Sequence, residues 1–227
     1  MTVRRFRASA AILDLDGTLL DTVPDLACAV NAMRAQLGLD GLATARVACF
    51  VGKGAEVLVH RAVTDDLEGR LPEPELRAAL ALFEHHYALE NGRQAVAYPG
   101  VREGLARMRA MGLRLAVVTN KPQAFTGPLL ARTGLAEAFE FFVGGDTLAR
   151  RKPDPEPMLH ASARLGLPPG RVLAIGDSIN DALAARAAGM PVFAVPYGYN
   201  EGHDVRSLDV DAIVDSLEHA ARLIDVV

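Results

Sequence analysis

The 227-residue chain is poor in several residue types, and each shortage excludes a class of protein. Its two cysteines, Cys28 and Cys49, are too few for a disulfide framework or a cysteine-rich zinc site, so we expect both to be reduced core residues. No apolar run approaches the roughly 20 residues of a membrane-spanning helix. The basic start at residues 1–7 is not followed by a cleavage-like segment. We therefore expect a cytosolic protein with no membrane partner.

Basic charge is also scarce, since the formal net charge is −4. This balance argues against a nucleic-acid partner, which usually requires a basic surface. Lysine occurs only at Lys53, Lys121 and Lys152, and all three positions are in loops beside small or turn-forming residues. This usage suggests that lysine is kept where a compact ammonium does something that the planar guanidinium of arginine does not.

The chain is nevertheless 50% hydrophobic, which is enough for a sizeable core. From about residue 100 onward, helical patterns alternate with short continuous apolar runs, and a similar run opens the chain near residue 10. This alternation predicts a doubly wound parallel sheet with helices on both faces. The expected strands are residues 10–13, 113–118, 141–146, 172–175, 192–195 and 212–214.

Between the first two expected strands lie about 70 residues with helical patterns only. A crossover between parallel strands needs only about a dozen residues. We therefore predict a helical cap domain at residues 21–95, inserted into an α/β core made of residues 1–20 and 96–227. Thr22 is the expected N-cap of the first inserted helix, with Asp25 as the acid of a short capping box.

Four polar clusters each follow an apolar run of this predicted sheet. They are Asp14 with Asp16, Thr119 with Asn120, Lys152 before a proline-rich helix start, and Asp177 with Asp181. Each alone has an ordinary explanation as a turn, a helix cap or a solvated lysine. Together they would meet at the carboxyl edge of the sheet, where open α/β sheets bind ligands.

These residue types indicate a particular chemistry. Converging carboxylates repel one another and favour a hard cation, so Mg²⁺ is the expected cofactor. A hydroxyl, an amide and a lysine offer donors to an anion with several oxygens. A carboxylate nucleophile, a second carboxylate as acid and base, Mg²⁺ and a lysine together suit phosphoryl transfer through an aspartyl-phosphate.

At this point the chain resembles phosphatases of the haloacid dehalogenase superfamily. Four of its segments resemble the motifs of that superfamily in the same order: residues 14–18, 119–120, 152–155 and 176–181. Further segments resemble the bacterial members that act on 2-phosphoglycolate: residues 51–55, 118–122, 144–146 and 197–200. The resemblance implies a small phosphorylated metabolite as partner, with 2-phosphoglycolate the expected substrate.

The same resemblance implies roles for the acidic residues. Asp14 would attack phosphorus and also ligate Mg²⁺. Asp16 would protonate the leaving alkoxide and then activate water, and its backbone carbonyl would ligate the metal. Asp177 would be a further metal ligand, and Asp181 and Thr18 would support the metal site from the layer behind, Asp181 by holding a metal-bound water.

It also implies a cradle for the phosphate. Gly17, through its backbone N–H, and the Thr119 and Asn120 side chains would bind phosphate oxygens. Lys152 would neutralise the nucleophile and the phosphoryl group. Lys53, in the cap loop where the family often has asparagine, would contact the non-phosphate end of the substrate.

Several alternatives stay open from the sequence. Another small-metabolite phosphatase, a pyrophosphatase or a phosphosugar mutase would use the same motifs, and a catalytically silent phosphate-binding module would keep the same fold. Tyr197 and Tyr199 would either line the cleft or pack against the sheet edge. We expect a monomer or a homodimer.

Overall fold

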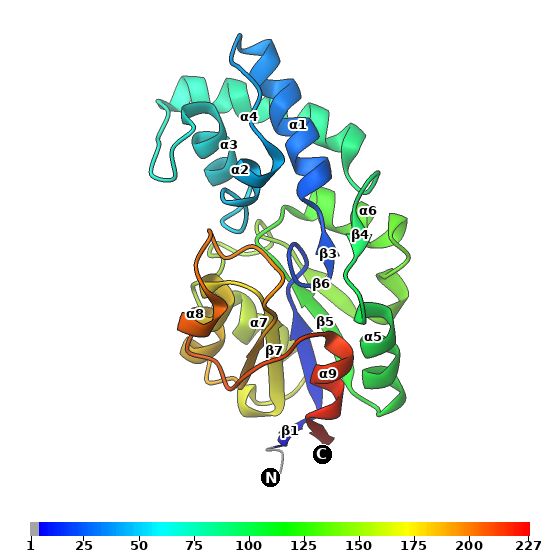
Figure 1. Ribbon diagram of the computed structural model, residues 1–227. Helices are drawn as coiled ribbons and strands as arrows, with labels where there is room; N and C mark the ends of the chain where they lie inside the picture. Colours follow the sequence, from blue (N-terminus) through cyan, green and yellow to red (C-terminus); the bar gives the residue numbers. More distant parts are fainter. Residues whose placement is uncertain (1–4) are drawn as a thin grey trace.

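The central sheet forms from the apolar runs that alternate with helices along the chain. The computed structural model describes residues 5–227 and contains a six-stranded sheet in the order β6-β5-β2-β7-β8-β9, with every neighbouring pair parallel (Figure 1). Its strands are β2 (Ala10–Leu13), β5 (Arg114–Val118), β6 (Phe141–Val143), β7 (Val172–Gly176), β8 (Val192–Ala194) and β9 (Ala212–Ile213). The predicted parallel sheet is thereby confirmed.

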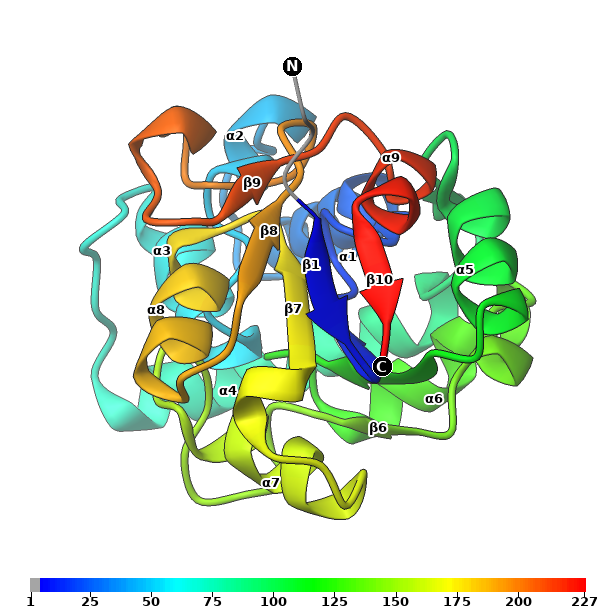
Figure 2. The ribbon, with the colours of Figure 1, turned by 90° about the horizontal axis from the view of Figure 1, so that it is seen from below.

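Helices cover both faces of this sheet, and Figure 2 shows α5 and α9 on one side with α7 and α8 on the other. The helices of this part are α5 (Val101–Ala110), α6 (Gln123–Arg132), α7 (Glu156–Arg164), α8 (Ile179–Ala187) and α9 (Leu217–Arg222). Three short 3₁₀ helices lie in connections, at Ala136–Ala138, Pro169–Arg171 and Val205–Ser207. Side chains of β2 alternate between two core clusters, with Ala11 and Leu13 in one and Ala10 and Ile12 in the other. A strand buried on both faces explains why its sequence is continuously apolar.

The order of the strands determines where a ligand fits. β2 lies in the middle of the sheet, between β5 and β7. The chain first extends the sheet on one side of β2, with β5 and β6, and then on the other side, with β7, β8 and β9. In open α/β sheets this switch point, outside the carboxyl ends of the strands, forms a crevice. The segments after β2, β5 and β7 carry most of the predicted site residues, and Lys152 lies in the loop after β6.

The inserted helices lie beyond this carboxyl edge, as Figure 1 shows. They are α1 (Val23–Gln36), α2 (Thr44–Ala48), α3 (Ala55–Thr64) and α4 (Glu73–Glu90). Their apolar faces form a separate core cluster that includes Met33, Phe50 and Phe83. The segment is joined to the sheet through a small antiparallel pair, β3 (Leu20–Asp21) with β4 (Val96–Ala97), which the sequence did not predict because each strand has only two residues.

A second strand pair was also not predicted. β1 (Phe6–Ala8) and β10 (Ile224–Val226) pair in parallel and bring the two ends of the described chain together (Figure 2). No helix within residues 5–227 is both long and apolar enough to cross a membrane. Residues 1–4, at the start of the predicted core, lie outside the described part.

Two local predictions were wrong. Cys28 is exposed and Cys49 is partly exposed, so neither is a core residue. Thr22 precedes α1 but makes no capping hydrogen bond, because its hydroxyl instead donates to Asp16 Oδ1 at 2.8 Å. Asp25 does not complete a capping box either, because its carboxylate accepts hydrogen bonds from backbone N–H groups beyond α4.

Candidate active site

Asp14 and Asp16 lie directly after the central strand β2. The Asp14 N–H donates to the Ile175 carbonyl of β7 at 2.9 Å, which fixes the end of β2 beside the end of β7. Gly17 follows with φ +87°, in the left-handed region, and a Cβ there would lie 2.4 Å from Asp177 Oδ2. Only glycine allows the chain to turn this closely past Asp177.

Asp14, Asp177 and Asp181 form a cluster in which one oxygen from each carboxylate lies within 4.8 Å of the others. Thr18 Oγ1 donates to Asp177 Oδ1 at 2.6 Å, and the Tyr199 N–H donates to Asp177 Oδ2 at 2.6 Å. These two donors hold Asp177 in one orientation. Thr18 therefore lies behind the cluster, in contact with Asp177.

The negative charges of these three carboxylates repel one another. Burial raises the pKa of Asp14 from its ordinary value to about 7, with Lys152 opposing and Asp181 adding to the shift. Burial, followed by repulsion from Asp181 and Asp14, raises the pKa of Asp177 well above its ordinary value. A divalent cation bound between these oxygens would relieve that repulsion, and oxygen donors are those that Mg²⁺ prefers. The residues present therefore fit a magnesium ion.

Lys152 is buried among these carboxylates. Its Nζ lies 2.9 Å from Asp14 Oδ1 and 2.6 Å from Asp181 Oδ1, and it donates to the Val118 carbonyl at 2.7 Å. Asp181 also forms a capping box with Ser178 at the start of α8. Asp181 is thus held by Lys152 and by the helix start, in addition to its place beside the other carboxylates.

Two expected phosphate donors are already used inside the protein. The Gly17 N–H donates to the Leu20 carbonyl at 2.9 Å, which corrects the expectation that it is free for phosphate. Asn120 Nδ2 donates to the carbonyls of Gly52 and Lys152, at 2.9 Å each, so its amide joins the cap loop to the lysine loop. The other polar atom of this side chain, the buried Asn120 Oδ1, makes no hydrogen bond within residues 5–227.

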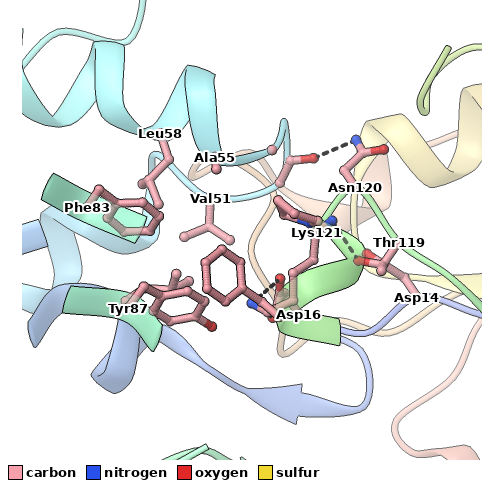
Figure 3. A pocket seen from close by; sticks show the side chains of 15 residues that line it. Asp14, Asp16, Val51, Ala55, Leu58, Phe83, Tyr87, Thr119, Asn120 and Lys121 are labelled. Atoms are coloured by element: carbon pink, nitrogen blue, oxygen red, sulfur yellow. Dashed lines mark hydrogen bonds and ion pairs between the residues drawn. The ribbon is translucent and has the colours of Figure 1, made fainter. Parts of the chain in front are cut away.

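Thr119 remains in the position that the sequence predicted, after β5 and against the pocket. Its Oγ1 accepts a hydrogen bond from the Lys121 N–H at 3.2 Å, which leaves the hydroxyl hydrogen to donate to a ligand. Asp14, Asp16, Thr119 and Asn120 all line one pocket (Figure 3).

The contact between Lys121 and Asp16 was not predicted from the sequence. Its Nζ lies 3.1 and 3.2 Å from the two carboxylate oxygens of Asp16, and 4.6 Å from the centre of the Tyr87 ring (Figure 3). Burial lowers the pKa of Lys121, but Asp16 and Tyr87 together more than offset this effect and raise the pKa above its ordinary value, so the ammonium stays charged. The scarcity of lysine singled out Lys121, but only the fold shows that it faces Asp16.

Lys53 lies elsewhere. Its Nζ is 2.8 Å from Glu201 Oε1, and Arg61 Nη1 lies 2.8 Å from the same oxygen. Lys53 does not line the pocket among the residues that the structure describes. Tyr197 and Tyr199 pack beside the carboxylate cluster, where Tyr197 Oη donates to the Thr18 carbonyl at 3.1 Å and the Tyr199 N–H donates to Asp177.

Comparison with known proteins agrees with this geometry. Residues 8–189 match the model of the haloacid dehalogenase-like hydrolases, and the chain belongs to this family. Among curated relatives, the phosphoglycolate phosphatase of Nitrosospira multiformis is 53% identical over 215 residues, 95% of each chain. The phosphoglycolate phosphatase of Thiobacillus denitrificans is 48% identical over 216 residues, again 95% of each chain. The crystal structure of a predicted phosphoglycolate phosphatase from Haemophilus somnus 129pt matches with a TM-score of 0.89 and 34% identity, covering 95% of this chain and 97% of that one.

Proposed function

We propose that the chain is a Mg²⁺-dependent phosphatase that hydrolyses 2-phosphoglycolate to glycolate and phosphate. The observation that carries this proposal is the cluster of Asp14, Asp177 and Asp181 at the sheet edge where Asp16 faces the pocket. The substrate comes from the relatives named phosphoglycolate phosphatase, which match 95% of the chain.

The reaction proceeds in two steps on the two aspartates. An Asp14 carboxylate oxygen attacks phosphorus, the bond between phosphorus and the ester oxygen breaks, and Asp16 gives its proton to the departing glycolate oxygen. Asp16 then takes a proton from water, which attacks the phosphorus of the aspartyl-phosphate and releases phosphate from Asp14. Lys152 balances the charge of Asp14 throughout.

Asp14, Asp177 and the Asp16 backbone carbonyl are the groups that would hold Mg²⁺. When bound, the ion neutralises phosphoryl charge that the protein alone cannot balance. Thr18 keeps Asp177 in place for this, and Asp181 supports the cluster from behind. The Thr119 hydroxyl donates to a phosphate oxygen, and Asn120 keeps the surrounding loops together.

Residues 21–95 act in this proposal as a cap over the core of residues 1–20 and 96–227. The cap contributes an apolar wall to the pocket, which keeps bulk water away from the reacting groups. We place the enzyme in the cytosol, as a monomer or homodimer acting on a small soluble metabolite.

The test is phosphate release from 2-phosphoglycolate beside sugar phosphates, nucleotides and pyrophosphate, with Mg²⁺ and then with EDTA. We expect a strong preference for 2-phosphoglycolate that EDTA abolishes. Equal slow hydrolysis of every compound would overturn the substrate but keep the phosphatase. No release from any compound would overturn the enzyme and favour a phosphate-binding module.

A further inference from the structure

The pocket has a polar floor and an apolar roof. The core supplies its charged side chains and the Thr119 hydroxyl, and the cap supplies most of its apolar side chains and the Tyr87 hydroxyl (Figure 3). The residues that line it are Asp14, Asp16, Leu26, Val51, Gly52, Gly54, Ala55, Leu58, Phe83, Tyr87, Thr119, Asn120, Lys121, Pro122 and Phe125. A dianionic phosphomonoester that also carries a carboxylate needs a cation in such a pocket at the end away from phosphorus.

Within the part of the chain that the structure describes, Lys121 is the one cationic side chain that lines this pocket. The other nearby cations are engaged by different carboxylates. Lys152 lies between Asp14 and Asp181, whereas Lys53 lies on Glu201. Lys121 is also paired with a carboxylate, that of Asp16, but both residues of this pair line the pocket.

The position of Lys121 matches the length of 2-phosphoglycolate. Its Nζ touches both oxygens of Asp16, which in the proposed mechanism protonates the ester oxygen of the substrate. Only one carbon atom separates that ester oxygen from the carboxylate carbon. A cation in contact with Asp16 is therefore within reach of the substrate carboxylate, and an ammonium has three hydrogens to share between the two groups.

Tyr87 supplies an independent observation. Its side chain is only 1% exposed and belongs to the pocket wall, and its hydroxyl interacts with the Lys121 ammonium but makes no hydrogen bond of regular geometry within residues 5–227. In Figure 3 the hydroxyl end is turned toward the Asp16 side of the pocket. A buried hydroxyl without a partner is costly, so such a group in a binding pocket points to a ligand that supplies the partner.

The ring of Tyr87 is also held rigidly. It stacks on Phe83 with centroids 5.4 Å apart and meets the edge of Phe125 at 4.9 Å. Lys121 Nζ lies over the same ring. The lysine of the core loop and the tyrosine of cap helix α4 are therefore fixed side by side.

We propose that Lys121 and Tyr87 form the binding site for the substrate carboxylate, an assignment that rests on the proposed function. The ammonium of Lys121 pairs with one carboxylate oxygen and the Tyr87 hydroxyl donates to the carboxylate from the cap. The apolar surroundings strengthen both contacts because little water competes for them. Selection of the substrate then depends on a residue of the core and a residue of the cap together.

The experiment compares 2-phosphoglycolate with ethyl phosphate, in which a methyl group replaces the carboxylate, in the wild type and in Lys121→Met and Tyr87→Phe. The measured quantity is the ratio of kcat/KM for the two substrates. We expect Lys121→Met to lower this ratio by about 10- to 100-fold and Tyr87→Phe to lower it by about 3- to 10-fold. Lys53→Met is the matched control, and its ratio should equal that of the wild type.

The outcomes separate this assignment from the proposed function. A wild type that hydrolyses ethyl phosphate but not 2-phosphoglycolate would overturn both. If the wild type prefers 2-phosphoglycolate and Lys121→Met keeps the same ratio, the carboxylate site alone is overturned. This includes the result in which Lys121→Met hydrolyses both substrates equally more slowly, which would mean that Lys121 only positions Asp16. A fall of the kcat/KM ratio in Lys53→Met would also overturn the carboxylate site. If Lys121→Met does not fold, Tyr87→Phe, which removes one oxygen atom, decides the question.

Discussion

Lys152 and Asp181 form a buried ion pair, with Nζ 2.6 Å from Oδ1 and side chains that are 2% and 3% exposed. The same ammonium lies 2.9 Å from Asp14 Oδ1, so one cation serves two of the three clustered carboxylates. Removing one partner of a buried pair leaves an uncompensated charge, which costs far more than the loss of an exposed pair. The cluster therefore depends on Lys152 for stability as well as for chemistry.

Lys152→Met should lower the free energy of unfolding of the metal-free protein by about 3–5 kcal/mol near neutral pH, because Asp14 and Asp181 lose their shared cation. Urea denaturation measures this. Arg77→Met is the control, since Arg77 pairs with Glu73 on an exposed helix face and should change stability by no more than about 0.5 kcal/mol. An equal loss of unfolding free energy in the two variants would show that the buried pair stabilises the fold no more than the exposed pair does.

Asp14→Asn should abolish phosphate release and leave the fold intact, because the amide is not a nucleophile for phosphorus. The variant also removes one charge from a repelling cluster, so its urea midpoint without metal should be no lower than that of the wild type. Asp16→Asn, which removes an acid and base but not the nucleophile, should slow turnover by about 10²–10⁴-fold. Substantial activity in Asp14→Asn would refute the assignment of the nucleophile.

Stability without metal should depend on pH in a defined direction. The pKa of Asp14 is raised in the folded protein to about 7, above its value in the unfolded chain. A raised pKa gives stability that is complete below the unfolded value and is lost as pH rises through the folded value. In EDTA, Tm should therefore fall between about pH 4 and pH 7. The raised pKa of Asp177 acts in the same direction.

Thermal denaturation at several pH values, with and without Mg²⁺, measures this dependence. Added Mg²⁺ should raise Tm more at about pH 8 than at about pH 5, because only the ionised carboxylates bind the ion well. An equal rise at both pH values would mean that Asp14 does not titrate in this range.

The sequence predicted those parts of the site that follow from strand geometry. Asp14 and Asp16 both line the pocket just after β2, and Asp177 meets Asp14 because parallel strands end at one edge. Lys121 and Tyr87 could not be paired in advance, because they lie on different segments and only the docking of α4 over the sheet edge brings them together.

Other features escaped prediction for related physical reasons. Asn120 has the amide that a phosphate site needs, but that amide is used by carbonyls of two distant loops. Cys28 sits in an apolar stretch and still faces outward, because helix α1 contacts its neighbours on the opposite side. Strands of two or three residues, such as β3 and β10, are too short to show a period in the sequence.

Asp25 anchors the entry and exit of the inserted helices. Its fully buried carboxylate near the start of α1 accepts hydrogen bonds from the backbone N–H groups of Gly92 at 2.8 Å, Gln94 at 2.8 Å and Ala95 at 3.2 Å, all on the segment that returns from α4 to β4. One side chain thus joins the two chain segments that connect the helices to the sheet. Hydrogen bonds to a charged acceptor are among the stronger ones in proteins.

Asp25→Ala should lower the free energy of unfolding by about 3 kcal/mol or more, because it leaves three backbone donors without their acceptor. Hydrogen exchange at Gln94 and Ala95 should become faster in the folded variant, which a general loss of stability would not confine to this segment. Asp209→Ala is the control, since that side chain is 84% exposed and should change stability by no more than about 0.5 kcal/mol. If Asp25→Ala unfolds at the same urea concentration as this control and the two amides keep their protection, the backbone hydrogen bonds within β3 and β4, and not Asp25, hold the helical segment to the sheet.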